Sequence, residues 1–480
     1  MSGDDVIDYQ RSVVTADRAG NIYVVGQYGS PTTMSGGTVA APNLYPHAPG
    51  YDLYVAKFDP AGNVKWLRTL GSSSPVESAY DVTVLSDGRL AIAASTSVSS
   101  GTPDFEGLPP GGAVHPLYED AIVTVLNTAD GSVAWTRAFG GPSADATWGV
   151  AAGPNGTVIV GGLMSPSQNP LLPDVHPDNP TGLFDVGWVA VLTREGETRW
   201  MRTFKPVRPV SEAEAKAGHN DRVMVTAVAV DGTGRVFVTG VTGSPHLPTT
   251  PGAVQRRMTT GSGDQGFVAV FRADGKGVEW ASYLGGHGYT RPNGLAVGRD
   301  GSVTVVGATD ANDFARVRPV QATCHTDGST GWGNSRAFVA RFAPGGGRLI
   351  QASCLGGTDL DVATNVRVAP DGSILLAGYT YSEDFPVRRP LREQPRDATY
   401  GNAFVAAIDP AGRLRTATVL GGTAEEQGSG MTLLPGGDVV IVGDTFSTDF
   451  PGAHSPALDG PLDPYGVVRA STFVARLHTV

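Results

Sequence analysis

The chain has 480 residues, more than one ordinary domain, so several domains or a repeat architecture is expected. Glycine (65) and proline (35) are abundant and charged residues make up only 17%, which suits many short strands joined by tight turns. The formal net charge of −11 argues against nucleic-acid binding through phosphates, and no apolar stretch is long enough to span a membrane.

The start of the chain, MSGDDVIDYQ, has neither the basic start nor the apolar core of a signal peptide. A signal peptide is therefore not present in this chain, and any leader has been removed or lies outside it. The two cysteines, Cys324 and Cys354, are too few for a disulfide framework. They lie in one repeat, so both a single disulfide and two buried free thiols fit the sequence.

One short segment recurs along the chain and sets its period. It ends in Leu-Gly-Gly at residues 284–286, 355–357 and 420–422, with variants at 70–72 and 139–141 and a weaker copy at 204–206. Successive copies are 65 to 80 residues apart. Tryptophan precedes the first four copies at Trp66, Trp135, Trp200 and Trp280, which predicts a repeated packing role.

Each copy contains four short runs with the alternating, β-branched pattern of half-buried strands. In the sixth copy these runs are residues 364–370, 373–380, 403–410 and 413–422. Short Asp-Gly, Asn-Gly or Gly-Gly turns join the first run to the second in all seven copies, as at Asp371-Gly372. The third and fourth runs are joined by similar turns, such as Asp409-Pro410-Ala411-Gly412.

Four-stranded antiparallel units at this period predict an all-β fold, a single seven-bladed β-propeller over residues 1–480. The approximate blades are 9–78, 79–146, 147–222, 223–291, 292–362, 363–427 and 428–480 plus 1–8. The seventh copy ends with its third run, so the last blade is expected to lack its outer strand. Alternatively, a longer N-terminus or β-strand addition by a partner completes that blade.

The phrases at 283–309, 354–386 and 419–451 resemble the bacterial seven-bladed β-propeller repeat family, the SBBP repeats. The resemblance rests on the spaced combination of Leu-Gly-Gly, Asp-Gly, Val-x-Gly-x-Thr and Asp-Phe-Pro, and it weakens in the first three copies. It implies a bacterial propeller that is extracellular or at the cell surface. It implies no single activity, because a fold does not fix a function.

If the first strand of each blade is innermost, one rim of the ring carries only tight turns. The other rim carries the long connections between the second and third strands, and we place the binding face there. An insertion at residues 205–222 lies on this long-loop rim. Its Ser211, Glu214 and Gly218 predict one short helix through a capping box and a glycine stop.

Two sets of repeated side chains mark the long-loop rim. The carboxylates of the Asp-Phe motifs (Asp313, Asp384, Asp449) and of nearby loops (Asp145, Asp359, Asp361, Glu425, Glu426) suit Ca²⁺. Because the motif recurs with the repeat, we favour a structural role, in which Asp caps a turn and Phe fills the gap between blades. No resident cofactor is predicted, and Ca²⁺ at these carboxylates is the alternative.

Candidate ligand-binding residues form a ring at the start of the inner strands: Tyr80, Trp148, Asn293, Thr364 and Ser429. Such a mixed aromatic and polar ring suits a sugar or peptide, although it equally suits a plugged channel. Trp332, in the glycine-rich stretch CHTDGSTGWGNS, is either an exposed partner contact or folded over its blade. No paired histidine spacing or hydrolase motif is visible, so neither catalytic nor metal-binding residues are predicted.

The leading hypothesis is a non-enzymatic binding or assembly scaffold that holds a protein or glycan partner on the long-loop rim. One alternative is a carbohydrate-active enzyme, a lyase or hydrolase, with carboxylates at the channel mouth. A third is a purely architectural subunit of a larger surface or secreted assembly.

Overall fold

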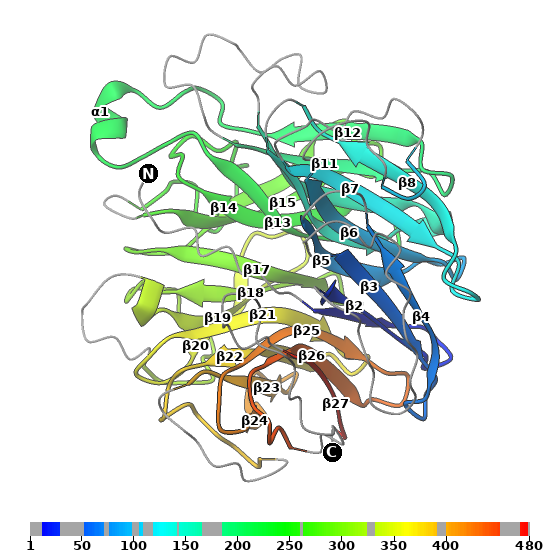
Figure 1. Ribbon diagram of the computed structural model, residues 1–480. Coiled ribbons are helices and arrows are strands. Elements are labelled where there is room, and N and C mark those ends of the chain that lie inside the picture. Colours follow the sequence, from blue (N-terminus) through cyan, green and yellow to red (C-terminus); the bar gives the residue numbers. More distant parts are fainter. Residues whose placement is uncertain are drawn as a thin grey trace.

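The computed structural model describes residues 12–28, 52–71, 76–97, 105–108, 119–141, 144–165, 185–259, 263–323, 332–390, 400–451 and 471–478. Within them, seven antiparallel sheets follow one another round a ring, so the predicted seven-bladed β-propeller is confirmed (Figure 1). Six sheets have four strands, and the last has three strands among the described residues. In every sheet the strands pair in chain order, as expected for consecutive hairpins.

The elements follow the repeat. Blades 1 to 3 contain β1 (Val13–Ala16), β2 (Ile22–Tyr28), β3 (Asp52–Phe58), β4 (Val64–Leu70), β5 (Val76–Val84), β6 (Leu90–Ser97), β7 (Glu119–Leu126), β8 (Val133–Phe139), β9 (Asp145–Ala152), β10 (Val158–Met164), β11 (Val186–Leu192) and β12 (Thr198–Phe204). Blades 4 to 6 contain β13 (Val223–Val230), β14 (Val236–Thr242), β15 (Gln265–Phe271), β16 (Val278–Leu284), β17 (Thr290–Val297), β18 (Val303–Thr309), β19 (Arg336–Phe342), β20 (Leu349–Leu355), β21 (Asp361–Val368), β22 (Ile374–Thr380), β23 (Asn402–Ile408) and β24 (Leu414–Leu420). Blade 7 contains β25 (Glu426–Leu433), β26 (Val439–Thr445) and β27 (Ser471–Leu477).

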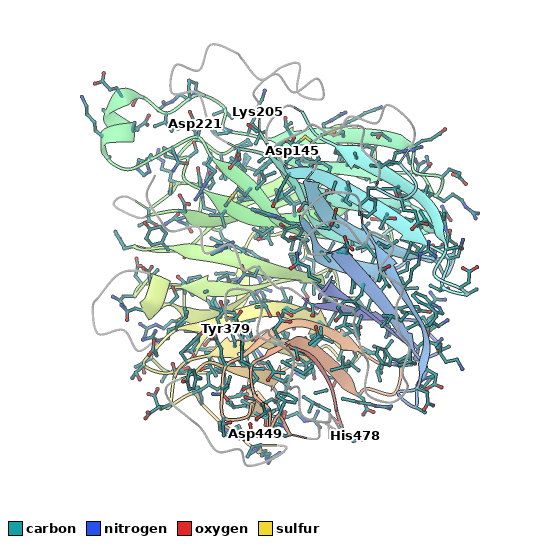
Figure 2. All side chains as sticks on the ribbon, viewed as in Figure 1. Asp145, Lys205, Asp221, Tyr379, Asp449 and His478 are labelled. Carbon is teal, nitrogen blue, oxygen red and sulfur yellow. The ribbon has the colours of Figure 1, made fainter. Side chains whose placement is uncertain are left out.

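The three helical segments are α1 (Glu212–Lys216) and the 3-10 turns η1 (Pro154–Gly156) and η2 (Trp332–Asn334). The predicted helix in the insertion is confirmed as α1. Its Ser211 hydroxyl accepts from Glu214 N at 3.3 Å, and Glu214 Oε2 accepts from Ser211 N at 2.8 Å. Figure 2 shows the insertion, with Lys205 and Asp221 labelled, at the edge of the ring.

A β-bulge in the inner strand of blades 2 to 7 explains the Val-x-Gly-x-Thr phrase. At each bulge the backbone of the inner strand lies close to the second strand of the same blade. A Cβ on Gly307 would lie 1.9 Å from the carbonyl oxygen of Arg291, and one on Gly240 would lie 1.8 Å from that of Met224. Only glycine fits there in blades 3 to 7, whereas blade 2 has Ala94 at the equivalent position. The repeated glycine therefore belongs to the geometry that lines the ring axis.

Apolar layers between neighbouring blades form the core. Leu375 and Val405 of blade 6, for example, pack against Ile441 and Phe473 of blade 7. The tryptophans of the outer strands add a second link, and their predicted packing role is confirmed. Trp135 Nε1 donates to the carbonyl oxygen of Arg194 in the next blade at 2.9 Å.

The ring closes by contact between blades 7 and 1. Val440 and Val442 of β26 pack with Val14, Val24 and Tyr54 of blade 1 in one apolar cluster. Polar links also span this joint: Ser12 Oγ lies 2.9 Å from Thr472 Oγ1, the Tyr54 hydroxyl donates to Thr472 Oγ1 at 2.9 Å, and Arg476 Nη1 donates to the Pro60 carbonyl at 2.8 Å. Ser12 Oγ also donates to Asp444 Oδ1 at 3.3 Å, and Ser429 Oγ donates to the Ser12 carbonyl at 2.6 Å. Side-chain packing therefore makes this joint in the described part of the chain.

The two rims differ as predicted from the sequence. First-to-second and third-to-fourth strand turns are tight, as in the bond from Gly372 N to the Ala369 carbonyl at 2.9 Å. Second and third strands are separated by more than 20 residues in every blade. These long connections, with the fourth-to-first loops, define the long-loop rim.

Candidate functional site: the central cavity and the long-loop rim

A cavity of about 360 Å³ lies on the axis of the ring. Residues of all seven inner strands, β1, β5, β9, β13, β17, β21 and β25, line it. Pockets for small molecules have volumes of roughly 300–1,000 Å³. The cavity is therefore large enough to hold one small ligand.

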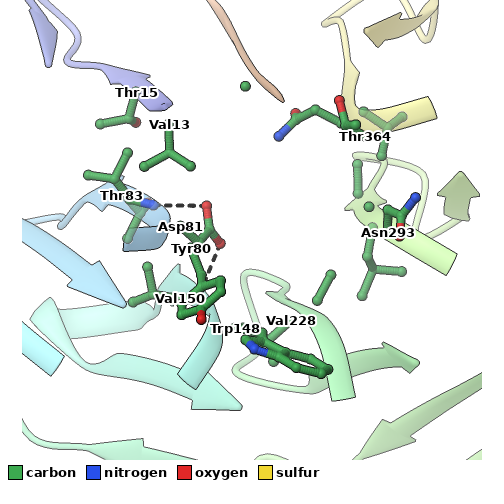
Figure 3. A pocket seen from close by; sticks show the side chains of 18 of the residues that line it. Val13, Thr15, Tyr80, Asp81, Thr83, Trp148, Val150, Val228, Asn293 and Thr364 are labelled. Atoms are coloured by element: carbon green, nitrogen blue, oxygen red, sulfur yellow. Dashed lines mark hydrogen bonds between the residues drawn. The ribbon is translucent and has the colours of Figure 1, made fainter. Parts of the chain in front are cut away.

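All five residues predicted to form a ring line this cavity: Tyr80, Trp148, Asn293, Thr364 and Ser429. Figure 3 shows Trp148, Asn293 and Thr364 on three strands around the same open space. Each is the bulged residue of its strand, which has no cross-strand partner in the ladder. Thr226, the bulged residue of blade 4, also lines the cavity and was missed. Contact of this ring with a ligand stays a prediction.

The polar bulged residues join one blade to the next. Thr226 Oγ1 donates to the Pro292 carbonyl at 2.8 Å. Thr364 Oγ1 donates to the Gly428 carbonyl at 2.9 Å, and Asn293 Nδ2 donates to the Ala363 carbonyl at 3.1 Å. Each acceptor immediately precedes the bulged residue of the following blade, so these side chains hold the wall of the cavity together.

Two aromatic residues occupy this position in blades 2 and 3. The rings of Tyr80 and Trp148 lie 6.5 Å apart between centroids, at 52° to one another. One side of the cavity is therefore an aromatic wall, and the opposite side is lined by small polar side chains. Aromatic faces of this kind bind planar apolar groups and sugars.

Asp81 is a cavity residue that the sequence analysis missed. Its carboxylate accepts from Val82 N at 2.9 Å and from Val150 N at 3.0 Å (Figure 3). Burial raises the pKa of Asp81 to about 6, although the two backbone donors and the charge of Arg367 lower it. Burial has the larger effect on this half-buried carboxylate, because the inner strands around the axis keep part of the solvent away from it.

Arg367 on β21 is the second charged residue in the wall. Its Nη1 donates to Asn365 Oδ1 at 2.8 Å and to the Val366 carbonyl at 2.9 Å. Burial lowers the pKa of the guanidinium from its usual value, and the charge of Asp81 raises it. The cavity thus contains one carboxylate and one guanidinium, carried by blades 2 and 6.

A cluster of aromatic and polar side chains stands on the long-loop rim between blades 6 and 7. We call it the rim cluster: Tyr381, Glu425 and Gln427, which are bonded to one another, with Phe446 and Tyr400, which main-chain bonds of Phe446 and Gly401 to this segment bring near them. The Tyr381 hydroxyl donates to Glu425 Oε1, and Gln427 Nε2 donates to the same oxygen at 2.8 Å. Phe446 N donates to the Glu425 carbonyl at 2.9 Å. Gln427 also lines the cavity, so the rim cluster and the cavity are continuous.

The Asp-Phe motifs make the local contacts that the favoured structural role requires. Asp384 Oδ1 accepts from Thr358 N at 2.7 Å, and Asp449 Oδ1 accepts from Thr423 N at 2.9 Å. The Phe385 ring lies 4.7 Å from that of Phe404 in its own blade, and it packs in one apolar cluster with Val306 and Ala337 of blade 5. The carboxylate takes up the space beside the Leu-Gly-Gly segment, which accounts for the second glycine of that motif.

The other rim carboxylates are also engaged in local bonds. Asp361 accepts from Gly357 N at 2.8 Å and Asp145 from Gly141 N at 2.7 Å, and burial raises the pKa of each to about 7. Among the residues that the structure describes, no three His, Cys, Asp or Glu side chains are grouped to hold a metal ion. Ca²⁺ at these carboxylates stays a prediction without support from this geometry.

The predictions for Trp332 and for the two cysteines involve side chains outside the described residues. Trp332 begins η2, and its side chain lies outside the described part of the chain, so its role stays a prediction. Cys354 is buried on β20 and is disulfide-bonded. Cys324, the other cysteine of the sequence, lies outside the described residues. No helix among the described residues is long and apolar enough to cross a membrane.

Comparison with known proteins adds no function. No family model matches the chain, and no curated protein matches its sequence. Solved structures to which it is similar include a protein of unknown function from Dyadobacter fermentans (11% identity, 93% of this chain and 92% of that one, TM-score 0.41). They also include a gluconolactonase from Xanthomonas campestris (14%, 68% and 79%, TM-score 0.32) and a europium-containing methanol dehydrogenase (10%, 91% and 81%, TM-score 0.39). The resemblance to SBBP repeats therefore stays a prediction beyond the seven-bladed fold.

Proposed function

We propose that the chain is a non-enzymatic, exported or surface-associated binding protein that holds a protein or glycan partner on its long-loop rim. The observation that carries this proposal is the placement of exposed aromatic rings. Tyr289, Tyr400 and Phe446 are 46%, 44% and 39% exposed, and all three lie on the long-loop rim. Exposed aromatic groups of this kind mark interaction surfaces.

The rim cluster supplies the chemistry that such a partner needs. Aromatic faces pack on sugar rings or on apolar side chains, while Glu425 and Gln427 offer a hydrogen-bond acceptor and a donor beside them. Tyr381 is held in place, because its hydroxyl is bonded to Glu425 and its ring lies against Gly401. A surface prepared in this way loses little side-chain entropy when it binds.

The disulfide at Cys354 supports export, because such bonds persist in oxidising compartments. The enzyme alternative lacks a comparable observation. Most glycoside hydrolases use a pair of carboxylates, and Asp81 is the only carboxylate among the described residues that line the cavity.

Point variants on the rim test the proposal. Tyr400→Ser with Phe446→Ser should weaken binding at least tenfold, both on a glycan array and to a partner captured from the native source. Val207→Ser is the matched control, because Val207 is 71% exposed in the insertion, away from the rim cluster. Binding that survives the double variant, or that falls equally with the control, would show that the rim cluster is not the binding surface.

A further inference from the structure

We propose that the central cavity binds a small zwitterion, with its anionic group on Arg367, its cationic group on Asp81 and its apolar part beside Tyr80 and Trp148. A free amino acid or a short peptide has this chemistry. The site is distinct from partner binding on the rim, and either of the two can fail without the other.

Charge is confined to two positions in an otherwise neutral wall. Among the described residues that line the cavity, only Asp81 and Arg367 carry a full charge. Asp81 directly follows Tyr80, the bulged residue of β5. Arg367 lies three residues after Thr364, the bulged residue of β21. The equivalent residues of the other blades are Val13, Gly149, Ala227, Gly294, Asn365 and Gly430 for Asp81, and Thr15, Thr83, Ala151, Ala229, Ala296 and Thr432 for Arg367.

These two charged groups do not neutralise each other by direct contact. No ion pair within 4.0 Å joins them, although each shifts the pKa of the other through space. Arg367 bonds protein through Nη1 alone, so the rest of its donor fork has no partner among the described residues. A guanidinium fork of this kind suits a carboxylate, which it binds through two parallel bonds.

The pair of opposite charges selects the class of ligand. A partly buried charge without an opposite charge beside it is costly, and a singly charged ligand compensates only one of the two. A zwitterion compensates both at once. Tyr80 directly precedes Asp81 in blade 2, and Trp148 of blade 3 lies beside Tyr80 in the cavity, so an apolar group next to the ammonium has an aromatic wall to contact.

Calorimetric titration of the full chain tests this assignment with defined probes. The probes are phenylalanine, tyrosine, leucine, Gly-Phe and Phe-Gly, each with its N-acetyl and its C-terminal amide counterpart. At least one free zwitterion should bind, and blocking either end should weaken binding at least tenfold. The assignment is overturned if no zwitterion binds, or if the blocked forms bind as well as the free ones.

Variants then identify the two charged groups. Arg367→Met should remove the preference for a free carboxylate, and Asp81→Asn the preference for a free ammonium. The matched controls, Arg413→Met and Asp274→Asn, alter exposed residues on the tight-turn rim and should bind normally. Preferences that persist in both cavity variants would contradict the site. If a variant does not fold, the comparison of free and blocked probes on the unaltered chain still decides.

Tyr400→Ser with Phe446→Ser separates this inference from the proposed function. The double variant should bind the zwitterion as tightly as the unaltered chain. Loss of zwitterion binding in that variant would move the site from the cavity to the rim.

Discussion

Trp200 Nε1 donates a hydrogen bond of 3.1 Å to the carbonyl oxygen of Ala273, which joins the outer strand of blade 3 to a turn of blade 4. The indole packs on the same turn, because a Cβ on Gly275 would lie 2.6 Å from the ring. The link repeats with Trp66 and Thr128 and with Trp135 and Arg194. In all three cases the bond runs from one blade to the next, so blades 1 to 3 are each linked to their successor.

Replacing Trp200 should weaken the contact between blades 3 and 4. Trp200→Phe removes the hydrogen bond and should lower the free energy of unfolding by about 1 kcal/mol. Trp200→Ala also removes the packing and should cost about 2–3 kcal/mol, since the ring is half-buried. Arg199→Ala, next to it but exposed, should change stability by less than about 0.5 kcal/mol. Chemical denaturation measures all three, and equal effects of Trp200→Ala and Arg199→Ala would refute the link.

The Leu-Gly-Gly and Asp-Phe motifs should be energetically coupled. A Cβ on Gly286 would lie 2.2 Å from Asp313 Oδ1, so Gly286→Ala should destabilise the chain by about 2 kcal/mol. Asp313→Ala removes the obstructing group, and the double variant should be less destabilised than the two single effects together, by about 1 kcal/mol. Gly232→Ala is the control, because nothing lies within 4 Å of its Cβ. Strictly additive single effects would contradict this coupling.

Asp81 should make the fold less stable at neutral pH. Its pKa is about 6 in the folded chain against 3.8 for the free group, so the folded state favours the protonated form. The destabilisation is absent below about pH 4 and complete above about pH 6, and Asp81→Asn should raise stability by about 1–3 kcal/mol at pH 7.5. At pH 3.5 the gain should disappear. Thermal unfolding at both values checks this, and an equal gain at the two would exclude titration of Asp81 as its cause.

The stability that Asp81→Asn gains should be accompanied by loss of ligand binding. If the cavity binds a zwitterion, Asp81→Asn improves the fold and impairs the site together, as is common for charged groups kept in binding sites. If Asp81→Asn instead lowered both the stability of the fold and ligand binding, the role of the carboxylate would be purely structural.

Blade 7 should tolerate a charged side chain at a position of its third strand where blade 6 does not. Val474 on β27 is 44% exposed, whereas Val405, at the same position of β23 in blade 6, is 6% exposed. Val474→Lys should change the melting temperature by little, while Val405→Lys should destabilise the chain by several kcal/mol. Equal destabilisation by the two would indicate that the outer side of β27 is covered.

The fold was predictable because the same local signals recur seven times. The turn at Asp371-Gly372 and its equivalents fix the register of the inner strands, which is why Tyr80, Trp148, Asn293, Thr364 and Ser429 were placed together. Thr226 has the same distance from its turn, but the insertion at residues 205–222 removes the Leu-Gly-Gly landmark in front of it.

The charged pair in the cavity was harder to find. Asp81 and Arg367 are 286 positions apart, and each looks like a solvated residue of a half-buried strand. A position-by-position comparison of the seven copies contains the signal, because small neutral residues fill nearly all equivalent places. The raised pKa of Asp81 was not predictable, because burial there depends on the convergence of seven strands around one axis.

The joint between blades 7 and 1 has no indole link among the described residues. The outer-strand tryptophans bond blades 1 to 3 to their successors, whereas the Pro60 carbonyl of blade 1 accepts from Arg476, which is paired with Asp438 of its own blade. Apolar packing and hydrogen bonds make this joint, with no ion pair between the two blades in the described part of the chain, so it should weaken little as ionic strength rises. The ring is therefore a closed circle in which the first and last blades meet through side chains alone. Under load it should open between β1 and β25 and unwind from there as a linear array of blades.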